Sequence, residues 1–253
     1  MFRSGNPALK ENTFLDAASG SVVTRDGEAM TINGTVNKTA LLLFLAVLTG
    51  AFAWNSIEIT EAGLSGNAML YLGAGTIGGL IFALATIFKQ TWAPVPAPLY
   101  ALFEGLALGA ISAIYDAKFD GIVLQAVMLT MATLFALLMA YRSGLIRATE
   151  NFKLGVVAAT GAIALIYLAS MLGNATGWFQ VPYLHDSGPI GIGISLVVIV
   201  VAALNLVLDF DFIESGAEAN APKYMEWYGA FGLMLTLVWL YLEFLRLLSK
   251  LRD

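Results

Sequence analysis

The sequence predicts an all-α integral membrane protein, built as a bundle of seven transmembrane helices. Of its 253 residues, 58% are apolar and 12% are charged, whereas a soluble domain carries roughly 25% charged residues. So little polar surface cannot coat a soluble globule. The apolar residues also form seven long runs, at about 39–57, 67–88, 97–115, 121–141, 154–173, 189–210 and 224–248.

Each run is long enough to cross a hydrocarbon core of roughly 30 Å at about 1.5 Å per helical residue. Each must be helical, because a lipid-facing backbone group cannot be left without a hydrogen-bond partner. The runs are continuous rather than alternating, which argues against a β-barrel. The run at 97–115 is the weakest of the seven, because it contains Glu104.

The chain before the first run predicts a flexible tail at residues 1–36, followed by the membrane domain at 37–253. The tail is rich in Gly, Asn, Ser and Thr, and the first apolar run starts only near Thr39. A secretory signal peptide would place its apolar segment much nearer the start, so none is expected. Ordering the tail would bury little apolar surface against a backbone cost of roughly 1–2 kcal/mol per residue.

Prolines and glycines mark the expected helix ends and packing faces. The proline-rich segment 92–98 separates the second and third runs, and Pro189 and Pro222 precede the sixth and seventh, where proline suits a first helical turn. Small residues four apart, in segments 75–79 and 105–109, allow close helix approach. A packing seam inside the bundle is favoured over a homodimer face.

Lysine and arginine counts predict a cytoplasmic N-terminus. With that orientation the outer loops hold only Lys118. The cations at the C-terminus oppose the preference for positive charge inside, because an odd number of crossings places them outside. A seventh segment that fails to cross fully is the alternative. The inner side would hold Lys38, Lys89, Arg142, Arg147, Lys153 and Lys223.

Several functions are excluded by composition. A net charge of −5 offers no basic face for nucleic acid. Without cysteine, and with His185 as the single histidine, disulfides, thiolate sites and multi-histidine metal sites are excluded; His185 itself is expected in a solvated loop. No hydrolase, zinc-protease or phosphate-loop motif is present, so no enzyme and no cofactor are expected.

Acids within or near hydrocarbon are costly and often functional. Asp209 and Asp211 end the sixth run, and Asp209 continues the face of Asn205 at i+4, so Asp209 is expected to point inward. Two solvated interfacial acids are the alternative. Glu226 falls in the first turn of the seventh run, where an acid is favoured by the helix dipole.

Consecutive antiparallel helices would bring Asp209, Asp211 and Glu226 to one membrane face. Two carboxylates in a poorly hydrated site cannot both ionise easily, so such a pair can hold a proton. Ionised, the pair can attract a hard cation through its oxygens. Glu104 is expected either to line a pathway or to be a satisfied buried acid. Glu243 is expected to pair with Arg246 within its helix.

The chain resembles a bacterial subgroup of the Bax inhibitor-1 (YccA-like, transmembrane BAX inhibitor motif) family. The resemblance lies in residues 98–112 (PLYALFEGLALGAIS), 203–211 (ALNLVLDFD) and 224–232 (YMEWYGAFG), with early segments 4–7 and 33–39. It implies a C-terminal helix that is central and a location in the bacterial inner membrane. It also implies a pH-sensitive calcium leak, with Asp209 as the first sensor aspartate and Lys89 as a latch.

The resemblance also implies that an acid on the last helix pairs with Asp209. Glu226 is the favoured partner, and Glu243 is less favoured. The expected function is a pH-sensitive cation leak with Ca²⁺ as the permeant ion, in contact with the lipid bilayer and with Asn205 and Glu104 lining the pathway. The alternative is a non-channel membrane regulator that binds membrane proteases or stress-response partners. A proton-coupled transporter is a third possibility, and the oligomeric state stays open.

Overall fold

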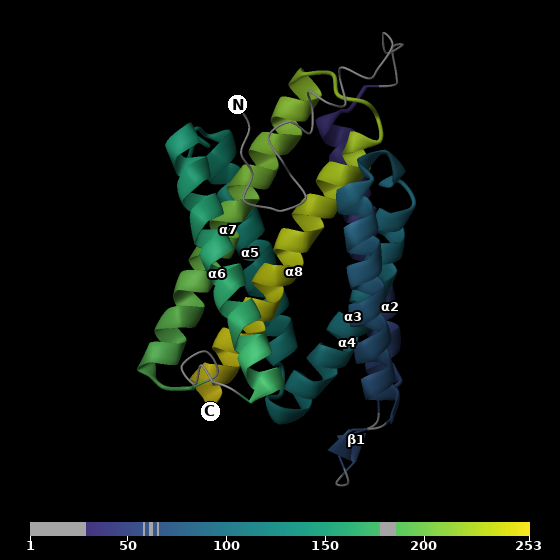
Figure 1. The fold of residues 1–253 in the computed structure, drawn as a ribbon, viewed down its shortest axis with the longest axis vertical. Coiled ribbons are helices and arrows are strands. Elements are labelled where there is room, and N and C mark those ends of the chain that lie inside the picture. Colours follow the sequence, from purple (N-terminus) through teal and green to yellow (C-terminus); the bar gives the residue numbers. More distant parts are fainter. Residues whose placement is uncertain (1–28, 58, 61–62, 65, 178–185) are drawn as a thin grey trace. The chain divides into compact units, whose positions relative to one another are not determined.

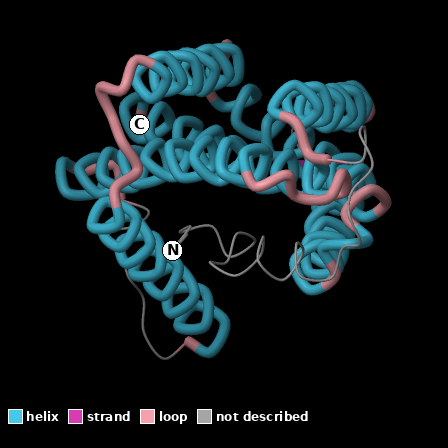
Figure 2. The backbone as a smooth tube through the Cα atoms, turned by 90° about the horizontal axis from the view of Figure 1, so that it is seen from above, coloured by secondary structure: helices cyan, strands magenta, loops and turns pink. Residues whose placement is uncertain are grey.

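The fold of the chain is seen in a computed structural model, which describes residues 29–57, 59–60, 63–64, 66–177 and 186–253. Within these residues, seven helices are long and apolar enough to cross a membrane, as predicted (Figure 1). Figure 2 shows that nearly all of the described chain is helical. The helices are α2 (Ile32–Asn55), α3 (Gly66–Phe88), α4 (Pro96–Lys118), α5 (Ile122–Arg142), α6 (Glu150–Thr176), α7 (Pro189–Glu218) and α8 (Met225–Arg252).

Two short elements between the helices were not expected from the sequence. Strands β1 (Ile59–Thr60) and β2 (Gly63–Leu64) pair antiparallel between α2 and α3. A 3₁₀ turn, η1 (Gln90–Trp92), lies in the proline-rich connection between α3 and α4. His185, expected in a loop, lies outside the described residues.

The first helix begins earlier than its apolar run. The side chain of Thr31 accepts a hydrogen bond from the Gly34 backbone N–H and caps α2, which starts at Ile32. A threonine at this position satisfies a backbone donor that the helix itself leaves open. The expected tail boundary at residue 36 therefore lies inside α2. Residues 1–28 are outside the described chain, so the tail stays a prediction there.

The sixth span ends later than expected, and this corrects the position of its acids. Helix α7 continues to Glu218, because Phe212 and Ile213 after the acids are apolar and buried. Asp209 and Asp211 therefore lie inside the helix rather than at its end. The unfavourable dipole at a helix C-terminus does not act on them, since that effect is confined to the last turn.

The described chain forms two compact units. Unit 2 holds α2, α3 and α4 with residues 212–234, that is, the end of α7 and the start of α8. In it α4 packs against both α2 and α3 (Figure 1). A side chain at Gly109 would collide with the Gly50 backbone, and one at Gly75 would lie 2.5 Å from the Ala107 nitrogen. The predicted packing seam inside the bundle is confirmed for these helices.

Unit 1 holds α5 and α6 together with residues 189–211 of α7 and 235–253 of α8. Its interior contains fully buried leucines such as Leu206, Leu240 and Leu245. Of the seven helices, α8 has the largest buried share of its apolar window, as expected for a central last helix. Its 28 residues correspond to about 42 Å at 1.5 Å per residue, enough for a full crossing.

Candidate functional site

The acid that the sequence placed inward, Asp209, has a side chain that is 0% exposed on α7. Asn205, one turn earlier on the same face, is also buried. Its amide nitrogen donates to the Thr160 hydroxyl on α6 and to the Val201 carbonyl, both at 2.8 Å. Among the described residues, no group donates a hydrogen bond to the buried Oδ1 of Asn205. The predicted inward face of α7 is therefore a polar strip inside unit 1.

The neighbouring acid, Asp211, is half-buried and bound to a lysine. Lys153 on α6 places its ammonium 2.8 Å from Asp211 Oδ2, and the lysine side chain is buried. Glu150 lies farther from the same ammonium, at 3.6 Å, and is 62% exposed. Asp211 therefore joins α7 to α6.

Near the other end of unit 1, the predicted pair of Glu243 and Arg246 is confirmed, with 2.6 Å between guanidinium and carboxylate. A third residue, which the sequence did not single out, completes the group. The Tyr167 hydroxyl on α6 donates to Glu243 Oε1 at 2.8 Å and accepts from Arg246 at 2.6 Å. Glu243 is 2% exposed, and its Oε2 receives no hydrogen bond from the described residues.

The last turns of α8 carry a buried cation. The ammonium of Lys250 donates to the Gly191 carbonyl at 2.9 Å and to the Ser195 hydroxyl at 3.0 Å. Both acceptors belong to the first turns of α7. A buried ammonium needs such oxygen partners, because moving a charge out of water without them is very costly. Lys250 thereby fastens the end of α8 to the start of α7.

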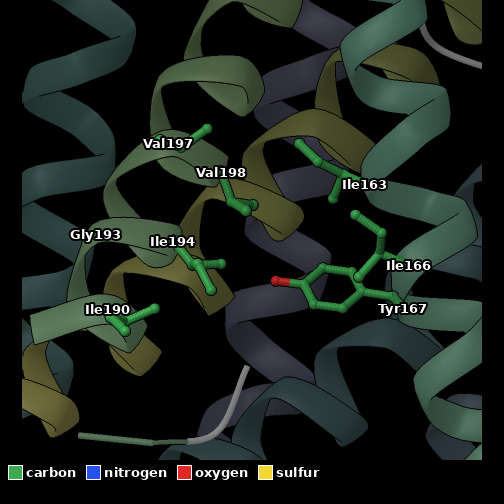
Figure 3. Close-up of a pocket in the computed structure, with 8 residues that line it drawn as sticks. All are labelled: Ile163, Ile166, Tyr167, Ile190, Gly193, Ile194, Val197 and Val198. Carbon is green, nitrogen blue, oxygen red and sulfur yellow. The ribbon is translucent and has the colours of Figure 1, made fainter. Parts of the chain in front are cut away.

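An apolar cavity lies beside Tyr167, between α6 and α7. It has a volume of about 520 Å³ and is lined by isoleucines of both helices and by valines of α7. Figure 3 shows the Tyr167 hydroxyl pointing into the space between the two sets of side chains. The polar group of Tyr167, Glu243 and Arg246 is thus bordered by apolar surface.

Glu226 lies in the first turn of α8, as expected, and is 0% exposed. In unit 2 its carboxylate forms ion pairs with Lys38 on α2 and with Lys223, the latter at 2.9 Å. Thr31 donates to it through both its backbone nitrogen and its hydroxyl, at 2.9 Å each. The carboxylate therefore lies at the N-terminus of α2, where the helix dipole favours negative charge.

Two features allow Glu226 to reach α2. A side chain at Gly34 would overlap the Glu226 carboxylate, so the glycine leaves open the space that the carboxylate occupies. The segment before α2 is also held beside the loop that joins α7 to α8: Ala29 pairs with Pro222, and the Met30 backbone N–H donates to the Ala221 carbonyl at 2.6 Å. Thr31, Gly34, Lys38, Lys223 and Glu226 are called the Glu226 clamp below.

The remaining predicted residues also lie in unit 2. Glu104, on α4, is partly buried, with a carboxylate oxygen close to Gly79 on α3. Lys89 follows α3 directly, and its ammonium lies 5.8 Å from the centre of the Trp92 ring. Asp209 belongs to unit 1 and Glu226 to unit 2, so their expected pairing stays a prediction, as does the latch role of Lys89.

Apart from the pairing of Glu243 with Arg246, the sequence did not predict the partners of these acids. Lys38 and Lys153 were expected only as charges on the inner side, and Thr31 lay within the expected tail. One signal was available, because Lys153, Thr160 and Tyr167 are seven residues apart on one helix. Within the described ranges, no group of three or more histidine, cysteine or acidic residues is placed to hold a metal ion.

Comparison with known proteins gives one match. A family model described as Bax inhibitor 1 like matches residues 6–253, which is almost the whole chain. Searches of curated proteins and of solved structures found no match.

Proposed function

Because the chain belongs to the Bax inhibitor 1 like family, we propose that this membrane protein is a pH-sensitive leak channel for cations, with Ca²⁺ as the permeant ion. The observation that carries the proposal is the complete burial of Asp209 on α7, a helix that is otherwise strongly apolar. An acid at such a position is costly and typically marks an ion or proton pathway.

The proposed gating depends on the charge of Asp209. When a proton is bound, the side chain is a neutral hydrogen-bonding group and the helices around it can stay closed. When the proton leaves, the carboxylate carries a buried negative charge that attracts cations, and its oxygens are ligands of the kind that Ca²⁺ accepts. Asn205, one turn away, supplies further polar surface to such a pathway.

Glu226 is retained as the proposed second sensor on the last helix. Its two lysine partners and its bonds to Thr31 also support a holding role, in which the clamp fixes the start of α8. An experiment distinguishes the two roles. If Glu226 is a sensor, its loss makes cation flux less dependent on pH, whereas if it only holds the start of α8, its loss raises flux at every pH.

The test is Ca²⁺ flux into proteoliposomes containing the purified protein, measured across a pH series. We expect flux to rise with pH, and Asp209→Asn to bring the ratio of alkaline to acidic flux close to one. Glu218→Gln is the matched control, because Glu218 is an exposed acid at the end of the same helix. An unchanged pH response in both Asp209→Asn and Glu226→Gln would refute the proposed sensor.

Absence of flux from the wild-type protein at every pH would refute the channel itself. The alternative is then a membrane regulator that binds membrane proteases or stress-response partners. Crosslinking in native membranes distinguishes the two, since a regulator would yield a stoichiometric protein partner.

A further inference from the structure

Helix α6 carries polar side chains at a regular spacing along one face. Lys153, Thr160 and Tyr167 follow one another at intervals of seven residues, close to two full turns, so they share one side of the helix. At 1.5 Å per residue the three positions are about 10.5 Å apart along the helix axis and together cover about 21 Å. These three residues are called the α6 stripe below.

Each member of the α6 stripe binds a polar partner on another helix of unit 1. Lys153 pairs with Asp211 of α7 at 2.8 Å, and the Thr160 hydroxyl accepts from Asn205 of α7 at 2.8 Å. Tyr167 donates to Glu243 of α8, also at 2.8 Å. The contacts form three levels across most of a roughly 30 Å hydrocarbon core.

The other side of α6 is apolar. Leu154, Leu165 and Leu172 are exposed large hydrophobic side chains turned away from the stripe, as a lipid-facing surface requires. The stripe therefore faces the interior of the unit, where polar groups are tolerated if they line a pathway or satisfy one another.

Two levels of the stripe include buried oxygens that receive no hydrogen bond from the described residues. They are Oδ1 of Asn205 at the middle level and Oε2 of Glu243 at the level of Tyr167. Buried polar atoms in native proteins are nearly always satisfied, by protein groups or by ordered water. These oxygens therefore indicate water or a cation between the helices.

We propose that the α6 stripe lines a water-accessible route through unit 1, and that permeating cations move along it. The part of this inference that concerns cations rests on the proposed leak function, whereas the water-accessible route itself does not. Lys153 and Arg246 act as tethered counter-ions at the first and third levels, where they neutralise Asp211 and Glu243. A cation entering the route takes the place of these tethered charges, while Thr160 and Asn205 offer neutral oxygens between them.

The absence of cysteine makes the route directly testable. Single variants Thr160→Cys and Ala162→Cys are exposed to a charged, membrane-impermeant methanethiosulfonate reagent in proteoliposomes of the full chain. The two positions lie about 3 Å apart along the axis, but Ala162 is on the exposed surface of α6. We expect rapid modification at position 160 and none at 162.

Equal modification at the two positions, or none at 160, overturns the route. A second measurement covers the case in which a cysteine disturbs folding. Thr160→Val keeps the side-chain shape and removes the oxygen that Asn205 binds, so cation flux should fall several-fold. Thr133→Val is the control, since the Thr133 hydroxyl is exposed and bonds to Leu129 of its own helix.

The outcomes separate this inference from the proposed function. If the wild-type protein passes cations while position 160 stays unmodified and Thr160→Val keeps full flux, the route is wrong and the leak stands. If position 160 is modified while the wild-type protein passes no cation, the route stands and the leak is wrong.

Discussion

The ammonium of Lys153 on α6 lies 2.8 Å from a carboxylate oxygen of Asp211 on α7. Because the lysine side chain is buried and the aspartate half-buried, water screens this pair poorly. Glu150 lies farther from the same ammonium and is well exposed. Asp211 is therefore the partner that determines how α6 and α7 are joined at this end of unit 1.

Asp211→Asn should lower thermal stability measurably. It removes the nearer charge from a buried ammonium, and hydrogen bonds to charged groups contribute roughly 1.5–3 kcal/mol. Glu150→Gln should change stability by less than about 1 kcal/mol, as exposed ion pairs do. Thermal unfolding of the purified protein in detergent, followed by tryptophan fluorescence, compares the two. Equal effects would contradict the importance of the buried pair.

Gly34→Ala should destabilise unit 2, because its methyl group would occupy the place of the Glu226 carboxylate. Loss of that carboxylate's bonds leaves Thr31 and Lys38 without their shared acceptor. Gly73→Ala is the matched control: a side chain there meets nothing within 4 Å. Alanine is the better helix former by about 1 kcal/mol, so this control should be neutral or stabilising in the same unfolding assay. A neutral Gly34→Ala would argue against the clamp.

Lys250→Met should loosen the start of α7, since the ammonium holds the Gly191 carbonyl and the Ser195 hydroxyl. Hydrogen–deuterium exchange read by mass spectrometry should show faster exchange in the peptides that begin α7. Arg252→Met serves for comparison, because its contact to Gln125 is exposed. If exchange in α7 is the same in both variants, Lys250 does not fasten this helix.

The expected orientation can be checked in the cysteine-free background. Ala117→Cys, at the exposed end of α4, should react with an impermeant maleimide added outside intact cells. Ser143→Cys, in the exposed turn after α5, should react only after permeabilisation, because its loop carries the inward-favouring arginines. The reverse pattern would place the N-terminus outside.

The seven spans could be predicted because the bilayer imposes a length and a helical backbone on every crossing segment. The inward position of Asp209 and the pairing of Glu243 with Arg246 followed from spacing along single helices. The end of α7 was placed too early, because the two acids were read as a boundary while the apolar residues after them continue the helix.

The partners of Asp211 and Glu226 could not be predicted, because they depend on which helices pack together. Thr31 and Glu226 are 195 positions apart in the chain, and no local pattern links them. Lys153 was counted only as a loop charge for orientation, although it is buried in a helix. The seven-residue spacing of the α6 stripe was visible, but its meaning depended on the positions of Asn205 and Glu243.

The pairing of Ala29 with Pro222 has a mechanical consequence. Ala29 and Met30 hold the start of α2 against the loop between α7 and α8 through backbone pairing. The next residue, Thr31, binds the Glu226 carboxylate. A displacement of residues 29–31 would therefore reach the first turn of α8 by two connections, the backbone pairing and the carboxylate.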